Sequence, residues 1–527
     1  MSDSITQQEV PSTESAGESP SIAALVAQTA SQAPGAPALV VTADRLPLSY
    51  RDLVGLVDDL AGQLKRGGLR PGDRVGLRTG SNAEFVVGLL AASRAELIAV
   101  PLDPALPLRE QGVRSDAAGA RVVLIDGAAP EGTDASRWWP IAVTVDGGTP
   151  RVTVDTAAGA KDDVATPQGL RPDDAMIMFT GGTTGTPKMV PWTRGNLAGS
   201  VRAIIAGYRL GPQDATVAVM PLYHGHGLVA ALLSTLVSGG TVLLPARGKF
   251  SAHTFWDDIH AVTATWYTAV PTIHQILLER AKTEHTASGP AALRFIRSCS
   301  APLTTETAAA LQDTFSAPVV CAFGMTEATH QVATTGIDAG ETPAETTGLV
   351  GASTSPEIRI VGSDGQPLPA ETVGEVWLHG PTVVRGYLGD PAITAANFTD
   401  GWLRTGDLGT LSPAGDLRIR GRIKELINRG GEKISPERVE GVLASHPGIV
   451  EVAVFPLPDA MYGETVAAVI VPRESGVPTP DELAEFCRDR LAPYEFPTTL
   501  LEAGELPHTA KGSLDRRAVA DKFGRPA

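Results

Sequence analysis

The order of apolar and polar residues predicts helices that alternate with short strands through most of the chain. This rhythm is typical of α/β layering, in which helices cover sheets. The longer predicted helices run from Ile22 to Gln32, Tyr50 to Arg66, Ala83 to Ser93 and Pro271 to Lys282. Apolar runs predict strands at Arg74 to Leu77, Thr216 to Met220, Gly240 to Leu244 and Pro318 to Ala322.

The pattern changes in the last third of the chain. Between Glu357 and His379, closely spaced apolar runs are separated by Gly/Pro turns, which indicates a β-rich subdomain. After Gly421 the pattern predicts a compact α+β unit, in which a helix from Ser435 to Ser445 precedes strands at Val450 to Phe455 and Thr465 to Val471 and a helix from Asp481 to Leu491. About a hundred residues of this kind are enough for a small independent domain.

These patterns divide the chain into three parts. Residues 1–20 are rich in Ser, Glu and Pro and have almost nothing to bury, so we expect a disordered tail. Residues 21–421 are expected to form a large N-terminal α/β domain that includes the small β subdomain. Residues 422–527 are expected to form a small C-terminal α+β domain.

Composition and charge narrow the classes of protein. With 527 residues, 43% of them hydrophobic and 19% charged, the chain is a globular protein too long for one ordinary core. No apolar run is long enough to span a membrane and no secretory signal begins the chain, so we expect a cytoplasmic protein without a membrane partner. The formal charge of -16 would repel nucleic acid. Three scattered cysteines fit neither a disulfide framework nor a CxxC metal site.

A loop rich in Gly and Thr follows the apolar run that ends at Phe179. Its sequence, FTGGTTGTPK, is not a P-loop, because Pro187 precedes Lys188 and Met189 follows it. Glycines let a backbone approach an anion closely, while hydroxyls and a lysine supply donors, so the loop suits a triphosphate. A plain hairpin turn is the alternative. The groups offered to a nucleotide are those of Thr180, Gly181, Gly182, Thr183, Thr184 and Lys188.

The loop resembles the TSGTTGxPKG signature of adenylate-forming enzymes, the superfamily of acyl-CoA synthetases, luciferases and nonribosomal-peptide adenylation domains. Gly181 replaces the usual Ser, and Met189 replaces a frequent Gly. The segment FGMTE resembles the family's [YF]GxTE, which implies that Phe323 packs on adenine, Thr326 meets the α-phosphate and Glu327 helps to hold Mg²⁺. Taken alone, FGMTE is more typical of an ordinary turn after a strand.

Two later segments match the same superfamily in order. WLRTGD is similar to [YW]xxTGD, whose aspartate, here Asp407, accepts from the ribose hydroxyls; an isolated TGD is otherwise a β-turn. GRIKELINRGGEKISP is similar to the segment that joins the two domains. That resemblance implies that Arg422 contacts the ribose side, that Lys424 is the hinge of a mobile C-terminal domain, and that Gly430 and Gly431 open a passage for pantetheine.

The C-terminal segment departs from the superfamily pattern. Its usual form, LPKTxxGK, ends in a lysine that stabilises charge during adenylation, whereas this chain has LPHTAKGS. Ser513 stands in the place of that lysine, and Lys511 lies two residues earlier. Two interpretations stay open: Lys511 reaches the same site on a flexible loop, which we favour, or the protein is a catalytically weak nucleotide-binding relative.

Four polar residues near these segments are candidates for binding the acid: His224, His226, Ser300 and His330. Histidine can donate to a carboxylate in either protonation state, which suits a short dicarboxylate better than a fatty acid. Several stretches, among them PLYHGHG, RSCSAPL and MTEATHQ, resemble the oxalate-CoA ligases. That resemblance implies that Ser300, His330 and one of His224 or His226 bind the acid; His224 is alternatively an aromatic gate.

The predicted function is therefore that of an acid–CoA ligase that uses ATP, Mg²⁺ and CoA. The carboxylate of a small acid, expected to be oxalate, attacks the α-phosphorus of ATP and releases pyrophosphate, and CoA then displaces AMP. A ligase for a longer or aromatic acid is the alternative within the same chemistry. The oligomeric state is not predicted.

Overall fold

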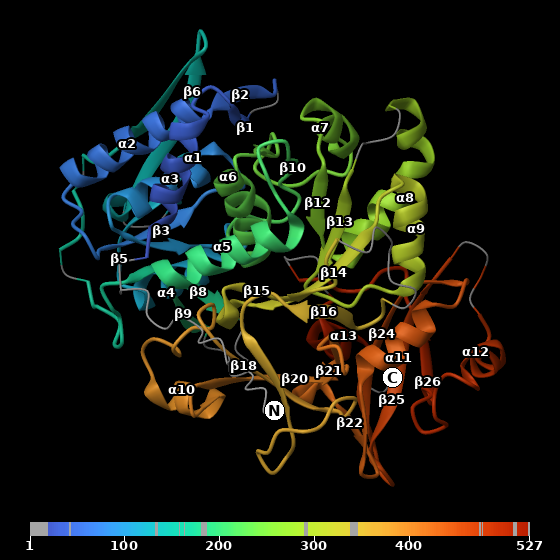
Figure 1. Cartoon of the computed structure of the whole chain (residues 1–527). Coiled ribbons are helices and arrows are strands. Elements are labelled where there is room, and N and C mark those ends of the chain that lie inside the picture. The colour runs from blue at the N-terminus through green and yellow to red at the C-terminus, as the bar shows by residue number, and fades with distance from the viewer. Residues whose placement is uncertain are drawn as a thin grey trace, which may run out of the picture.

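A computed structural model describes residues 19–41, 44–131, 135–157, 159–162, 164–180, 187–288, 293–337, 346–473, 476, 478–509 and 514–524, with only the backbone of 285–288. Helices and mixed sheets form layers across the N-terminal part, and a smaller group of helices and strands lies below them in Figure 1. The α/β class predicted from the sequence is confirmed, including its β-rich segment and its α+β unit.

A seven-stranded sheet forms the first layer of the N-terminal part. Its strands follow the order β7, β6, β5, β3, β4, β8, β9, and the five neighbouring strands from β6 to β8 pair in parallel. Their bounds are β3 (Arg74–Arg78), β4 (Ile98–Pro101), β5 (Ala120–Ile125), β6 (Trp138–Asp146), β7 (Thr149–Val154), β8 (Asp174–Thr180) and β9 (Lys188–Thr193). Helices α1 (Ile22–Gln32), α2 (Tyr50–Arg66), α3 (Ala83–Arg94) and α4 (Leu108–Ala117) belong to this layer.

A fourteen-stranded sheet forms the second layer and runs from β2 at one edge to β17 at the other. Its first half contains β1 (Pro37–Val41), β2 (Leu46–Ser49), β10 (Ala215–Val217), β11 (Thr241–Leu243), β12 (Trp266–Ala269), β13 (Phe295–Cys299) and β14 (Val319–Met325). Its second half contains β15 (His330–Thr334), β16 (Leu349–Ser353), β17 (Glu357–Val361), β18 (Gly374–His379), β19 (Phe398–Thr399), β20 (Trp402–Leu411) and β21 (Leu417–Arg422). The helices around it are α5 (Arg194–Tyr208), α6 (Ser234–Ser238), α7 (Phe255–Ala261), α8 (Pro271–Ser288), α9 (Thr305–Phe315) and α10 (Pro391–Asn397).

The C-terminal unit, drawn in orange and red in Figure 1, is built on a sheet of its own. It contains strands β22 (Ile427–Arg429), β23 (Glu432–Ile434), β24 (Ile449–Asp459), β25 (Gly463–Pro472) and β26 (Thr499–Glu502) with helices α11 (Pro436–Ala444), α12 (Pro480–Cys487) and α13 (Arg516–Phe523). Two buried clusters of apolar side chains lie on the two sides of this sheet. Helix α11 also packs against β21, so this unit faces the end of the large sheet.

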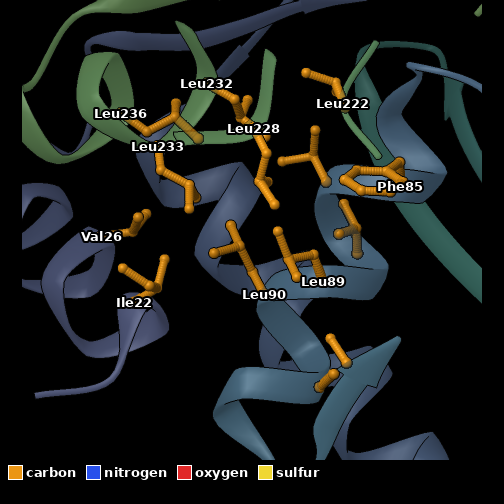
Figure 2. Close-up of a cluster of buried hydrophobic side chains, with 14 of the residues drawn as sticks. Ile22, Val26, Phe85, Leu89, Leu90, Leu222, Leu228, Leu232, Leu233 and Leu236 are labelled. Atoms are coloured by element: carbon orange, nitrogen blue, oxygen red, sulfur yellow. The ribbon is translucent and has the colours of Figure 1, made fainter. Parts of the chain in front are cut away.

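A leucine-rich core holds the segment that carries the candidate histidine His226. Residues His226–Leu233 form a π-helical turn that continues into α6. Figure 2 shows Leu228, Leu232, Leu233 and Leu236 of this segment packed toward α1 and α3, and all four are fully buried. Because each fully buried leucine contributes roughly 1.5–3 kcal/mol, the segment is firmly anchored on its apolar side.

Two predicted elements end three or more residues early in the structure. The strand expected to reach Met220 ends at Val217, because the amide of Val219 bonds to the carbonyl of Val217 in a tight turn that leaves the sheet. The helix expected to reach Leu491 ends at Cys487, where turns bring Leu491 back onto the core. Among the described residues, no helix is long and apolar enough to cross a membrane.

Candidate active site

A cavity of about 760 Å³ lies between the end of the large sheet and the C-terminal unit. Strands β14, β16, β20 and β21 line one side of it, and helix α11 lines another. Four residues predicted from the sequence line this cavity: Ser300, Phe323, Asp407 and Arg422. The structure thus brings together segments that are more than a hundred residues apart in the chain.

Asp407 and Arg422 form an ion pair at the wall of this cavity. They are direct partners in the β20–β21 hairpin, and Arg422 Nε lies 2.8 Å from Asp407 Oδ1. The other carboxylate oxygen, Oδ2, is buried and has no hydrogen-bond partner among the described residues. Burial raises the pKa of Asp407 to about 6, although Arg422 opposes that shift. A buried acceptor without a donor is a costly feature in a folded protein, and a ligand hydroxyl would satisfy it.

The predicted FGMTE segment crosses from β14 into a short 3-10 turn at Thr326–Ala328. Gly324 is required here, because a Cβ atom at this position would lie 1.7 Å from the carbonyl oxygen of His330 on the adjacent strand. The carbonyl of Thr326 accepts a hydrogen bond from Trp192 Nε1 at 2.7 Å. These contacts fix the backbone that carries Phe323 and Glu327.

Glu327 and Lys188 lie near each other on the other side of this turn. The buried Glu327 accepts a hydrogen bond from the hydroxyl of Tyr387 at 2.9 Å. Lys188 Nζ lies 4.6 Å from the centre of the Tyr387 ring and donates to Asn397 Oδ1 at 3.2 Å. Burial lowers the pKa of Lys188, and the charge of Glu327 opposes that shift. The arrangement places a cation and a carboxylate side by side.

The Gly/Thr loop, which we predicted to bind phosphates, connects two antiparallel strands. Thr180 ends β8, Lys188 begins β9, and the two residues are direct partners across the hairpin. Strands β8 and β9, which flank the loop, pair as a hairpin, and this pairing leaves both interpretations of the loop open. Gly181, Gly182, Thr183 and Thr184 lie outside the described residues.

Three of the four candidate acid-binding residues meet in one polar cluster, in which His226 and His330 are buried and Ser300 is exposed. His226 Nδ1 lies 3.1 Å from Ser300 Oγ, and the rings of His226 and His330 stack with their centres 5.4 Å apart. Ser300 and His330 both have a positive φ, of 74° and 81°. Residues other than glycine seldom adopt this backbone conformation, and those that do are concentrated at functional sites.

His224 has a different setting from His226. Its ring packs edge-on against Tyr223, and Nε2 lies 3.8 Å from a carboxylate oxygen of Asp103. Of the two histidines in the sequence PLYHGHG, His226 is therefore the one in contact with Ser300. This geometry leaves the gate alternative for His224 open.

The sequence interpretation missed Arg297, which lies beneath the cluster on β13. Its guanidinium is fully buried and donates to four side chains: Tyr208, Thr268, Gln331 and His330. Among the described residues, no carboxylate forms an ion pair with it. An arginine inside the apolar run Phe295–Cys299 was the available signal, because buried charges are rare unless they are paired.

The residues predicted to form the hinge and the pantetheine passage lie at the start of the C-terminal unit. Lys424 is in a 3-10 turn at Ile423–Glu425, between β21 and β22. Gly430 and Gly431 form the β22–β23 turn with positive φ values of 61° and 101°, which favour glycine. Lys511 and Ser513 lie outside the described residues. Before them, His508 Nε2 lies 2.6 Å from Glu451, and after them Arg516 lies 2.5 Å from Glu440.

Comparison with known proteins relates the chain to one enzyme family. Residues 26–388 match the family described as AMP-binding enzyme, and residues 438–513 match the AMP-binding enzyme C-terminal domain. The chain is 40% identical to an oxalate–CoA ligase from Arabidopsis thaliana over 513 residues, which cover 96% of this chain and 99% of the relative. It is 39% identical to a sulfoacetate–CoA ligase from Cupriavidus necator over 363 residues, covering 68% and 70% of the two chains.

Solved structures show the same fold. ATP-bound MatB from Rhodopseudomonas palustris superposes with a TM-score of 0.81 at 28% identity, covering 95% of this chain and 99% of that chain. The o-succinylbenzoate coenzyme A synthetase MenE from Bacillus subtilis, in complex with ATP and magnesium ion, superposes with a TM-score of 0.78 at 28% identity, covering 94% and 98%.

Proposed function

The chain belongs to the AMP-binding enzyme family and is an AMP-forming acid–CoA ligase, and we propose that its acid is oxalate. The ligase uses ATP, Mg²⁺ and CoA. The observation that carries the proposal is the cluster of Ser300, His226 and His330 in hydrogen-bond contact with the buried Arg297, which has no carboxylate partner among the described residues. A pocket for a fatty acid would need an apolar lining at this end, whereas a short dicarboxylate needs donors and positive charge.

Two relatives support a small acid with a second anionic group. One is an oxalate–CoA ligase and the other a sulfoacetate–CoA ligase. Both acids have two carbon atoms and an oxyanion beside the reacting carboxylate. In this chain Ser300 lines the cavity, so it would be the first member of the cluster that such an acid meets.

The nucleotide would bind along the wall formed by β14, β20 and β21. Oδ2 of Asp407 is free to accept from the ribose hydroxyls, while Arg422 neutralises the carboxylate from the other side. Phe323 offers its ring to the adenine, and Thr326 meets the α-phosphate. Lys188, Thr180 and the loop residues Gly181, Gly182, Thr183 and Thr184 would hold the other phosphates.

The residues around Glu327 fit a Mg²⁺ ion that travels with the nucleotide. Among the described residues, no three acidic, histidine or cysteine side chains form a metal cage. Mg²⁺ often binds through one carboxylate and otherwise keeps water and substrate phosphates, so Glu327 alone is a sufficient protein ligand. When bound, the ion neutralises phosphate charge. Tyr387 orients Glu327 by its hydrogen bond to one carboxylate oxygen.

The reaction then proceeds in two balanced steps. A carboxylate oxygen of the acid attacks the α-phosphorus, and the bond from phosphorus to pyrophosphate breaks, which leaves an acyl-adenylate. The sulfur of CoA, after losing its proton, attacks the acyl carbon, and AMP departs with the electrons of the broken C–O bond. Such transfers depend mainly on positioning and on neutralised charge.

The two steps need different groups beside the same atoms, so we propose that residues 422–527 move as a unit about Lys424. In one position Lys511 would stabilise the charge that develops during adenylation. In the other, Gly430 and Gly431 would leave room for the pantetheine arm, because neither carries a side chain.

The experiment is acid-dependent exchange of pyrophosphate into ATP with oxalate, sulfoacetate, malonate, benzoate and octanoate. Oxalate is expected to give the highest kcat/KM, and a preference for benzoate or octanoate would contradict the proposal. Lys511→Ala should reduce exchange by roughly 100-fold to 1,000-fold, while Ser513→Ala, its matched control, should not. No exchange with any acid would favour the nucleotide-binding relative.

A further inference from the structure

Arg297 reaches both histidines of the acid cluster through hydrogen bonds in which it can only donate. We infer that Arg297 is a positioning residue that sets the tautomers of His226 and His330, so that the cluster presents donors alone to the acid. The inference rests on the proposed function and deepens it, because it names the residue that selects acids with a second oxyanion.

The first path from Arg297 leads directly to His330. Guanidinium nitrogens carry protons and accept nothing, so the nitrogen they contact must offer a lone pair. Arg297 Nη2 lies 3.1 Å from His330 Nε2. His330 Nε2 is therefore the acceptor, and the ring proton of the neutral imidazole resides on Nδ1. No described residue accepts from that Nδ1–H, which leaves it as a donor for a ligand.

The second path leads through Thr268 to His226. Arg297 Nη1 donates to Thr268 Oγ1 at 3.0 Å, and Thr268 Oγ1 lies 2.6 Å from His226 Nε2. His226 Nε2 is the one described acceptor within reach of the Thr268 hydroxyl proton, so that nitrogen is unprotonated. The proton of His226 then resides on Nδ1 and is donated to Ser300 Oγ, 3.1 Å away. The hydroxyl proton of Ser300 remains for the ligand.

The two paths end at neighbouring groups of one cluster. The rings of His226 and His330 are stacked, and Ser300 lines the cavity. Burial, and secondarily Arg297, lowers the pKa of both histidines well below the usual range, so both rings are neutral and carry one proton each. On this inference, Ser300 O–H, at the cavity wall, and His330 Nδ1–H, in the buried ring, are left as the two donors for the acid, with Arg297 at the start of both hydrogen-bond paths.

This arrangement favours acids whose far end carries a negative charge and accepts hydrogen bonds. An acid that ends in a carboxylate or a sulfonate accepts from both donors and neutralises the buried guanidinium. An acid that ends in a methyl group does neither and leaves two polar groups unpaired, which typically lowers kcat/KM by about 100-fold or more. The inferred substrate class is thus a two-carbon or similarly short acid with an oxyanion at its far end.

Thr268→Val tests the relay without removing the charge. Valine has nearly the shape of threonine but no hydroxyl, so His226 loses the group that fixes its tautomer while Arg297 stays. The KM for oxalate should rise about tenfold, with kcat and the KM for ATP within twofold of wild type. Ser298→Ala is the matched control, because Ser298 is a neighbour of Arg297 on β13 and its buried hydroxyl has no partner among the described residues. An unchanged oxalate KM in Thr268→Val would overturn the inference.

Nitrogen NMR of the ¹⁵N-histidine-labelled protein reads the tautomers directly and does not depend on which acid is used. Of the ten histidines, His226 and His330 should carry their protons on Nδ1, and the variants His226→Gln and His330→Gln assign the two signals. Thr268→Val should change the His226 signal and leave that of His330. Protons on Nε2 in the wild-type protein would overturn the inference even if oxalate proved to be the substrate.

Arg297→Gln tests the selection by charge. The ratio of kcat/KM for oxalate over that for acetate should fall about 100-fold, while AMP affinity is retained as proof of folding. Arg297→Lys provides a second variant, which keeps the positive charge but cannot donate to all four side chains. Its ratio of kcat/KM for oxalate over acetate should therefore lie between those of the wild type and Arg297→Gln. An unchanged ratio in both variants contradicts the inference. A wild-type preference for benzoate would instead contradict the proposed function and leave the tautomer measurement interpretable.

Discussion

Asp407 and Arg297 are two buried charges near the same cavity, and they differ in where their counter-charge lies. Asp407 pairs with Arg422 on the adjacent strand and has one oxygen left over. Arg297 contacts a tyrosine, a threonine, a glutamine and a histidine, all of them neutral. An uncompensated buried charge is costly. Asp407, whose charge is paired, is therefore suited to bind neutral hydroxyls, whereas Arg297 is suited to bind an anion. On the proposed assignment of the site, the protein itself neutralises the charged residue that faces the nucleotide, whereas the acid would neutralise the charged residue near it.

The largest expected effect comes from removing the carboxylate on the nucleotide side. Asp407→Ala takes away an acceptor for the ribose and leaves Arg422 without its partner, so the KM for ATP in pyrophosphate exchange should rise at least about 100-fold. The KM for oxalate should stay within about twofold. Asp416→Ala, in the turn of the same hairpin, is the control. Equal rises in the KM for ATP and the KM for oxalate would mean that the nucleotide and the acid are not bound by separate groups.

The next largest effect should come from the acid side. His330→Gln removes the Nδ1–H donor and a ring that accepts from Arg297, so the KM for oxalate should rise roughly 30-fold. AMP affinity, measured by calorimetry, should be unchanged. The exposed His379 offers a matched control, since His379→Gln is expected to alter neither quantity. A loss of AMP affinity in His330→Gln would contradict the proposed division of the site.

A smaller effect should appear when the pH is lowered, and it should change nucleotide binding but not acid binding. Burial raises the pKa of Asp407 from 3.8 to about 6, so its carboxylate gains a proton as the pH falls through that value. AMP affinity should therefore drop about tenfold between pH 7 and pH 5, and in Asp407→Asn it should be nearly independent of pH. The folded pKa exceeds the unfolded one, so this group's contribution to stability falls as pH rises from about 4 to 6.

The acid side should behave differently over the same pH range. The pKa values of His226 and His330 lie well below the usual range, so both rings stay neutral. The KM for oxalate should be constant from pH 7 to pH 5. A parallel pH dependence of AMP and oxalate binding would show that a shared group, and not Asp407, is being titrated.

Much of the fold followed from local patterns, and the failures have physical causes. The helices beginning at Ile22 and Tyr50 have the predicted bounds, because serine caps and apolar periodicity are local signals. The strand through Val217 was predicted too long, since one backbone hydrogen bond ends it and apolar residues continue beyond it. The FGMTE and TGD segments were found by motif, and the structure places Phe323 and Asp407 on one cavity.

Arg297 was missed because its role depends on residues that are distant in the sequence. Nothing near it in the run FIRSC predicts that Tyr208, Thr268 and His330 will surround its guanidinium. Likewise, the choice between His224 and His226 depends on how the π-helical turn faces Ser300, and sequence spacing contains no information on that.

The leucines that anchor the π-helical turn have a practical consequence for redesign. Leu228, Leu232 and Leu236 do not line the cavity, yet they anchor the segment whose first residue, His226, contacts Ser300. An engineer who wants this ligase to accept a bulkier acid could therefore mutate the packing layer around α1 and α3 and leave the polar cluster intact. Shortening one of these leucines would give the segment that carries His226 room to shift, a change that libraries confined to the residues lining the cavity do not include.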